Sequence, residues 1–192
     1  MTRTLPLLAL SVSLLACTTP AFAAGPPDFQ ALMKQEREAL ALLTRFQGNW
    51  RGPATVRKSD GSSVELTQTE RVGPMLDGAL LMIEGRGFAA DGSMPFNALG
   101  VVSFDPAANR YLFRAWAQGF GNDFAMEVAQ DSFSWSIPTG PGTVHYVATV
   151  KDDVWTETGE FQMPGQPARR IFEMHVKRIG DSDWPAAGAL TP

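Results

Sequence analysis

The sequence predicts an all-β protein: a single antiparallel up-and-down β-barrel of about ten strands, with an N-terminal helix covering one end. Three observations support this. After residue 48 the apolar residues change from a helical period to alternation, turn-forming residues recur at short intervals, and every connection between the predicted strands is short. Neighbouring strands should therefore pair in space, and a long meander removes its exposed edges by closing.

The first residues indicate an export signal. Arg3 precedes an apolar run and then small residues, which is the three-part pattern of a secretory leader. Ala21-Phe22-Ala23 fits the small-x-small cleavage rule, so residues 1–23 are the predicted signal peptide of a periplasmic or secreted bacterial protein. Leu14-Leu15-Ala16-Cys17 resembles a lipobox, so the alternative is cleavage before Cys17, a lipid tether there and an outer-membrane-anchored lipoprotein.

Composition narrows the class of partner. The chain of 192 residues has a net charge of -4 and no basic run, which argues against nucleic acid and against an anionic membrane surface. The apolar run of the leader is shorter than the roughly 20 residues that a membrane span needs. Cys17 is the only cysteine, so cleavage after Ala23 leaves a chain without disulfides or thiol catalysis.

Residues 24–47 are predicted to hold the helix. Asp28 is a plausible N-cap for a helix that runs to about Phe46, and Gly48 can end it with a positive φ. One face of this helix carries a loose apolar stripe, which predicts that it packs on the barrel. The stripe consists of Phe29, Leu32, Met33, Leu40, Leu43 and Phe46.

Residues 48–180 form the predicted barrel domain, and residues 181–192 form a C-terminal tail. The predicted strands lie near 49–58, 63–73, 79–88, 95–104, 110–118, 123–129, 132–138, 143–150, 154–162 and 169–179. Alternation then assigns an inner face to several of them. In the last strand, Phe172, Met174, Val176 and Arg178 share one face, and an inward arginine is costly unless another group takes its charge or stacks on it.

A Gly-x-Trp at residues 48–50, together with an inward arginine in the last strand, resembles the calycin superfamily of lipocalins, fatty-acid-binding proteins and nitrobindins. The segments GNW, MLDGALLMIEG, FNALGVVSFDP, VWTETGE and FEMHVKRIG are most similar to a bacterial branch of uncharacterised, secreted lipocalin-like domains. The resemblance covers about residues 43–180, and it implies that Arg178 lies across the face of Trp50 at the closed end of the barrel. That branch has no activity to transfer.

A ten-stranded barrel is wider than an eight-stranded one, so its side chains do not fill the interior and a cavity is expected. Polar residues predicted on the inward faces suggest that this cavity binds a ligand. Gln68, Glu70, Tyr146 and Glu157 would orient the polar end of a ligand, and Phe124, Phe133, Trp135 and Trp155 would line the apolar part. Buried carboxylates need cations, for which Arg86 and Arg114 are the candidates, although the sequence leaves their orientation open. A structural salt-bridge network and a catalytic acid–base pair remain alternatives.

The histidines do not suggest a metal or haem site. Nitrobindins bind haem through a histidine near the C-terminus. Here His175 has the opposite parity to the inward Arg178, so it is predicted to point outward. His145 has the opposite parity to the inward Tyr146 and is predicted to point outward as well. No metal ligand set and no cofactor are therefore expected, and the glycine-rich stretches read as turns and not as phosphate loops.

The leading hypothesis is an exported, non-enzymatic β-barrel that binds a small apolar or amphipathic molecule in its interior. The second is a structural or interaction protein of the cell envelope with a filled barrel, which lipidation at Cys17 would favour. The third is an enzyme that uses the inward carboxylates, since a fold does not exclude catalysis.

Overall fold

The structure, a computed structural model, describes residues 27–185. The predicted leader, with Cys17, and the end of the predicted tail lie outside these residues. Within them, no helix is long and apolar enough to cross a bilayer.

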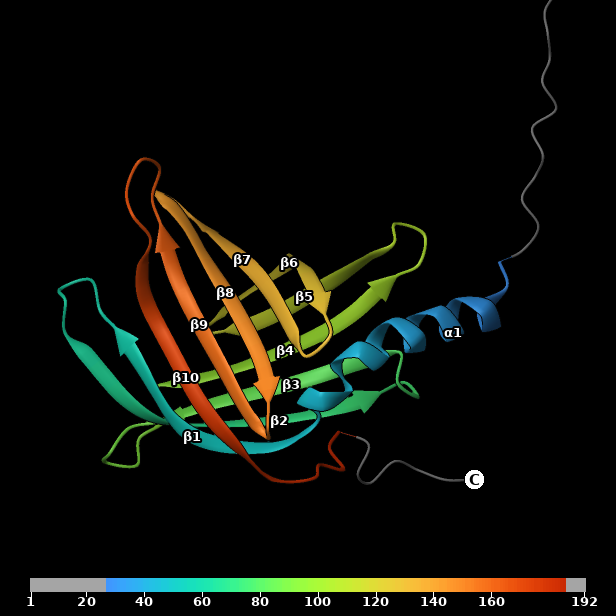
Figure 1. The fold of residues 1–192 in the computed structure, drawn as a ribbon, viewed down its shortest axis with the longest axis horizontal. Helices are drawn as coiled ribbons and strands as arrows, with labels where there is room; N and C mark the ends of the chain where they lie inside the picture. Colours follow the sequence, from blue (N-terminus) through green and yellow to red (C-terminus); the bar gives the residue numbers. More distant parts are fainter. Residues whose placement is uncertain (1–26, 186–192) are drawn as a thin grey trace, which may run out of the picture.

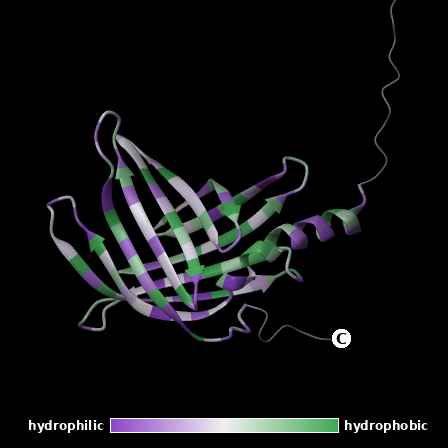
Figure 2. Cartoon of the chain, in the orientation of Figure 1, coloured by the Kyte–Doolittle hydropathy of each residue, from purple (hydrophilic) through white to green (hydrophobic). Residues whose placement is uncertain are grey.

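Ten antiparallel strands close into one up-and-down barrel, which confirms the predicted fold class (Figure 1). The strands are β1 (Gly48–Arg57), β2 (Ser63–Met75), β3 (Leu80–Phe88), β4 (Phe96–Asp105), β5 (Arg110–Ala117), β6 (Phe120–Ala129), β7 (Ser132–Thr139), β8 (Gly142–Lys151), β9 (Val154–Gln162) and β10 (Arg169–Gly180). Each strand pairs with its neighbours in sequence, and β1 pairs with β10 to complete the circle. Along the strands, hydrophobic and hydrophilic positions alternate in short bands (Figure 2). This pattern is expected of a barrel with an apolar interior and an exterior that faces solvent.

The N-terminal helix consists of two parts, α1 (Phe29–Leu40) and a 3₁₀ helix, η1 (Ala41–Phe46). Asp28 caps α1 as predicted, because its carboxylate accepts hydrogen bonds from the backbone N–H groups of Gln30 and Ala31. The predicted apolar stripe is only half correct. Leu40, Leu43 and Phe46 are buried, whereas Phe29 and Met33 are exposed.

The reason lies in where the helix sits. Its contacts with the barrel run mainly to β3 and β4, the hydroxyl of Tyr111 in β5 donates a hydrogen bond to the carbonyl of Ala39, and its first turns project beyond the barrel wall (Figure 1). The end of the barrel is therefore covered by η1 and the last turn of α1.

The closed end of the barrel is filled by aromatic side chains around η1. Phe46 packs against Phe133, with ring centroids 4.7 Å apart, and against Trp155 at 5.1 Å. Trp50 is fully buried, meets Trp155 edge to face, and donates a hydrogen bond of 2.8 Å from its indole N–H to the carbonyl of Phe46. A tryptophan at the start of β1 thus ties the first strand to the helix that precedes it.

Arg178 of β10 lies over this tryptophan. Its guanidinium carbon is 4.4 Å from the ring centroid of Trp50, and the two residues are cross-strand partners where β1 meets β10. The guanidinium also donates hydrogen bonds to the backbone carbonyls of Gln47 and Arg45. Together these contacts join the first strand, the last strand and η1 at the closed end.

Candidate ligand-binding cavity

The other half of the barrel is hollow. A cavity of about 520 Å³ opens between the hairpins β1–β2, β3–β4, β5–β6, β7–β8 and β9–β10, and residues next to these turns form its rim, namely Arg57, Pro95, Gln118, Ile137 and Ile171. Its floor is the aromatic cluster around Trp155. The filled barrel of the second hypothesis therefore does not describe this protein.

All eight residues predicted for the cavity lie on its wall. They are Gln68 and Glu70 of β2, Phe124 of β6, Phe133 and Trp135 of β7, Tyr146 of β8, and Trp155 and Glu157 of β9. Alternation brings them together, because positions i and i+2 of a strand point to the same side of the sheet. In each of these strands one side faces solvent, and the eight residues lie on the other side. Their presence on the wall is a fact of geometry, while their role in binding stays a prediction.

Stacked aromatic rings form much of the apolar wall. Trp135 and Tyr146, which are paired across β7 and β8, stack with ring centroids 4.8 Å apart and an interplanar angle of 8°. Phe113 of β5 meets Trp135 edge to face at 5.2 Å, and Phe133 stacks on the same indole at 5.6 Å. Such rings offer a flat, rigid surface for an apolar ligand.

Phe113 was missed by the sequence reasoning, as were Phe96 and Phe172 as lining residues. A signal was present for Phe113: the stretch RYLFRAW puts Arg110 and Arg114 on one face, so the intervening Phe113 should face inward. The apolar Leu112 and Trp116 on the arginine face obscured this alternation.

The polar part of the wall centres on β2. Gln68 is 2% exposed and Glu70 8% exposed, and the amide Nε2 of Gln68 donates a hydrogen bond of 2.7 Å to a carboxylate oxygen of Glu70. Burial raises the pKa of Glu70 well above its usual range, and the nearby carboxylate of Glu157 adds to this effect. Gly85 of the neighbouring β3 leaves room here, since a Cβ at that position would come within 2.9 Å of the Glu70 carboxylate.

Glu157 and Tyr146 are the second polar group. Both are partly accessible because they border the cavity, yet barrel atoms surround them. Burial raises the pKa of Glu157 to about 8, against a smaller lowering by the nearby indole of Trp155, and burial together with the Glu157 charge raises the pKa of Tyr146 to about 12. The indole N–H of Trp155 is buried and makes no hydrogen bond of good geometry with any described residue.

The two arginines proposed as countercharges lie elsewhere. Arg86 is exposed on the outer face of β3 and pairs with Glu84 at 2.6 Å, and Arg114 is exposed on β5 and pairs with Asp123 at 2.5 Å. Both belong to the outward parity of their strands, which settles the orientation that the sequence left open, and neither candidate neutralises an inner carboxylate. Among residues 27–185, no ion pair joins Glu70 or Glu157 to a cation. The alternative of a structural salt-bridge network around these carboxyls therefore has no basic residue to form it.

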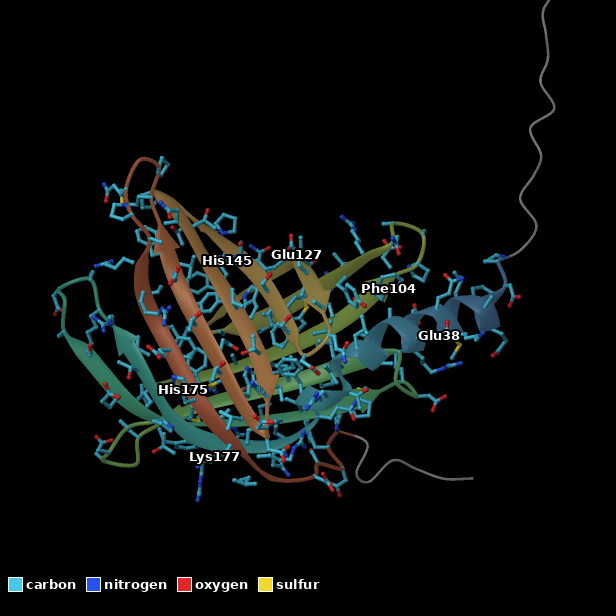
Figure 3. The ribbon with its side chains drawn as sticks, viewed as in Figure 1. Glu38, Phe104, Glu127, His145, His175 and Lys177 are labelled. Carbon is cyan, nitrogen blue, oxygen red and sulfur yellow. The ribbon has the colours of Figure 1, made fainter. Side chains whose placement is uncertain are left out.

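Both histidines are on the outer surface of the barrel (Figure 3). His175 lies 2.9 Å from a Glu173 oxygen, and His145 lies 2.9 Å from the hydroxyl of Ser136. Neither histidine lines the cavity. The described part of the chain has no group of three side chains placed to hold a metal ion.

Fold and site together define a class: a hollow β-barrel whose cavity has an apolar aromatic wall and a buried polar group of two carboxyls, an amide and a phenol. Residues 35–126 match the model of a family described as "Protein of unknown function (DUF1579)". A comparison with curated proteins gave no match.

The chain is similar in fold to the crystal structure of Rv2717c from M. tuberculosis. The two share 14% identity with a TM-score of 0.55, over 73% of this chain and 96% of the other. At this identity the likeness concerns the barrel fold alone. It agrees with the predicted barrel, while the resemblance to the calycin superfamily remains a prediction.

Proposed function

We propose that the protein is an exported, non-enzymatic β-barrel that binds a small apolar or amphipathic molecule in its interior. One observation carries the proposal: a cavity of about 520 Å³, open at one end, with an aromatic wall and four polar side chains, Gln68, Glu70, Tyr146 and Glu157. Ligand sites in proteins have volumes of roughly 300–1,000 Å³ and are lined mainly by apolar side chains with a few convergent polar groups. Small residues keep the space free, among them Gly85, Ala98, Gly100 and Ala115.

Native mass spectrometry of the protein, expressed from its full-length sequence in a bacterium and purified from whole cells, tests this proposal. We expect a co-purified small molecule, or a rise in melting temperature with fatty acids, quinones or haem, because a ligand that binds only the folded state stabilises it by about 2.7 kcal/mol at a hundred times its dissociation constant. If nothing co-purifies and none of these compounds shifts melting, the proposal is wrong.

A matched pair of variants ties the result to the cavity. Ala115 of β5 lines the cavity, and Ala125 of β6 is exposed on the outer face. Ala115→Phe should fill space and abolish binding, whereas Ala125→Phe adds the same ring outside and should bind as the wild type does. Equal binding by both variants would place the ligand elsewhere.

The same spectra test export. Residues 1–23 support cleavage after Ala23, which gives one mass, and the lipobox alternative gives another, with a lipid on Cys17. A mass that retains the leader would contradict both forms of the proposal.

A further inference from the structure

Once its two carboxyls are ionised, the polar group of the cavity offers more hydrogen-bond acceptors than donors. The amide N–H₂ of Gln68 is directed to Glu70, which leaves the Oε1 of Gln68 buried without a hydrogen-bond partner among the described residues. The carboxyl of Glu157 accepts no hydrogen bond of good geometry within the same residues, although the indole N–H of Trp155 is close. A ligand that gives the Oε1 of Gln68 a partner must therefore bring an N–H or O–H group.

The charge of the site is equally one-sided. Glu70 and Glu157 face one another across the cavity, and Tyr146 is the other titratable group that faces them from the surrounding strands. The negative charge of Glu84, on the outer face of β3, also raises the pKa of Glu70. Among the described residues that line the cavity, Arg57 is the only arginine, and it is exposed at the rim. Two carboxyls thus share an enclosed space into which no described residue sends a positive charge.

We infer that the ligand is an amphiphile whose head group is a protonated amine, held between Glu70, Glu157 and the free Oε1 of Gln68, with its apolar part along the wall of Trp135 and Tyr146. This inference rests on the proposed function, and it names the chemical class of the ligand. An ammonium group has three N–H donors and no acceptor, so one head group can donate to the Oε1 of Gln68 and to an ionised carboxylate together. Hydrogen bonds between such a cation and carboxylates are about twice as strong as neutral ones.

Other head groups fit less well. A carboxylate finds no opposite charge in this site: it repels Glu70 and Glu157 once they ionise, and it can bind only while they keep their protons. A ketone or quinone oxygen accepts hydrogen bonds but donates none, so the Oε1 of Gln68 would stay without a partner. An alcohol has one donor and no charge. The aromatic rings favour the cation further, since a positive charge is attracted to the face of tryptophan and tyrosine.

Binding of a cation should release a proton. With the pKa of Glu157 at about 8, this carboxyl is mostly protonated at neutral pH in the empty protein. An ammonium ion beside it favours the ionised form, so the carboxyl proton passes to the solvent as the complex forms. The affinity for an amine should therefore rise with pH up to about 8, while the affinity for an uncharged amphiphile should not.

Calorimetry with three probes of equal chain length tests this inference: dodecylamine, 1-dodecanol and dodecanoate, each below the concentration at which it aggregates. At pH 8 we expect dodecylamine to bind at least about tenfold more tightly than 1-dodecanol, with dodecanoate the weakest. Titrations in two buffers of different ionisation enthalpy should show proton release with the amine alone.

Variants locate the effect. The double variant Glu70→Gln/Glu157→Gln should still bind 1-dodecanol, which shows that its barrel is intact, and should lose the preference for the amine. Glu127 is an exposed glutamate of β6 (Figure 3), so Glu127→Gln is the matched control and should keep the preference. If the double variant does not fold, proton release by the wild-type protein decides by itself.

The outcomes separate the two proposals. Dodecanoate or 1-dodecanol bound as tightly as the amine, no proton release, or a preference that survives the double variant would overturn the inference and leave the proposed function standing. Failure of all three probes to bind would refute the inference and count against the proposed function as well.

Discussion

Arg178 shows how one inward charge is accommodated in an apolar barrel. Besides the ring of Trp50, its guanidinium has the carbonyls of Gln47 and Arg45 as acceptors and forms an ion pair of 3.2 Å with Asp153. Its side chain is 24% exposed, so part of the charge reaches solvent. Stacking, hydrogen bonding and partial hydration together offset the cost of burying a cation.

The first prediction concerns the Trp50–Arg178 pair. Trp50→Ala should lower the free energy of unfolding by about 3–5 kcal/mol, because it removes a fully buried ring. Arg178→Met keeps most of the volume and should cost less, on the order of 2 kcal/mol for the lost cation–π contact and hydrogen bonds. Urea unfolding of both single variants measures these changes.

The double variant Trp50→Ala/Arg178→Met should cost less than the sum of the two single changes, since residues in contact are coupled. Strict additivity would mean that the contact contributes nothing to stability, and the calycin resemblance would lose its main physical support.

The second prediction concerns pH. The pKa of Glu157 is raised from 4.5 to about 8, so between these values the folded protein holds a proton that the unfolded chain has lost. The free energy of unfolding should therefore fall as pH rises through this window, on the order of 1 kcal/mol per pH unit, and level off above pH 8. Glu70, whose pKa is also raised, should contribute with the same sign.

Glu157→Gln should flatten this dependence and leave the protein more stable than the wild type at pH 8, with Glu127→Gln unchanged as the exposed control. Urea unfolding at pH 5, 6.5 and 8 provides the measurement. A wild-type stability that rises over this range would contradict the assignment of a protonated carboxyl in the cavity.

At the scale of elements, the two parts of the N-terminal helix differ in what they contribute. Phe46 in η1 is fully buried against Phe133 and Trp155, whereas Phe29 in α1 is 66% exposed. Burial of a phenylalanine against a packed cluster stabilises a protein by several kcal/mol, and an exposed ring contributes little. The closed end therefore depends on η1.

The third prediction follows from this difference. Phe46→Ala should cost about 3–5 kcal/mol and Phe29→Ala less than about 0.5 kcal/mol, measured as the shift in urea midpoint at constant slope. The same chemical change at both ends of one helix is its own control. Equal costs would mean that the outer turns of α1 pack on the barrel after all.

Strand positions were well predicted from the sequence, because alternation and turn residues are local signals. The largest difference from the structure is at the start of β6, which begins at Phe120 and not at residue 123. The orientation of Arg86 and Arg114 could not be read in the same way, since apolar residues occupy both faces of their strands. Only the pairing with Glu84 and Asp123 across the outer surface settles it.

At the scale of the whole molecule, the sequence located the cavity wall but not its electrostatics. Parity placed Gln68, Glu70 and Glu157 inside, which needs no knowledge of distant residues. Whether a cation accompanies them depends on which side chains arrive from other strands, and only the closed barrel shows that. The void itself is also a property of the complete circle of strands.

The joining of β1 to β10 has a consequence for the order of folding. Every other strand pair connects sequence neighbours through a short turn, but the Arg178–Gln47 hydrogen bond joins residues 131 positions apart. Closing so long a segment costs chain entropy that local hairpins do not, and contacts of high sequence separation form slowly. Until β10 has arrived, a nascent chain has two open sheet edges and no enclosed interior, so enclosure and edge protection come together as a late, cooperative event.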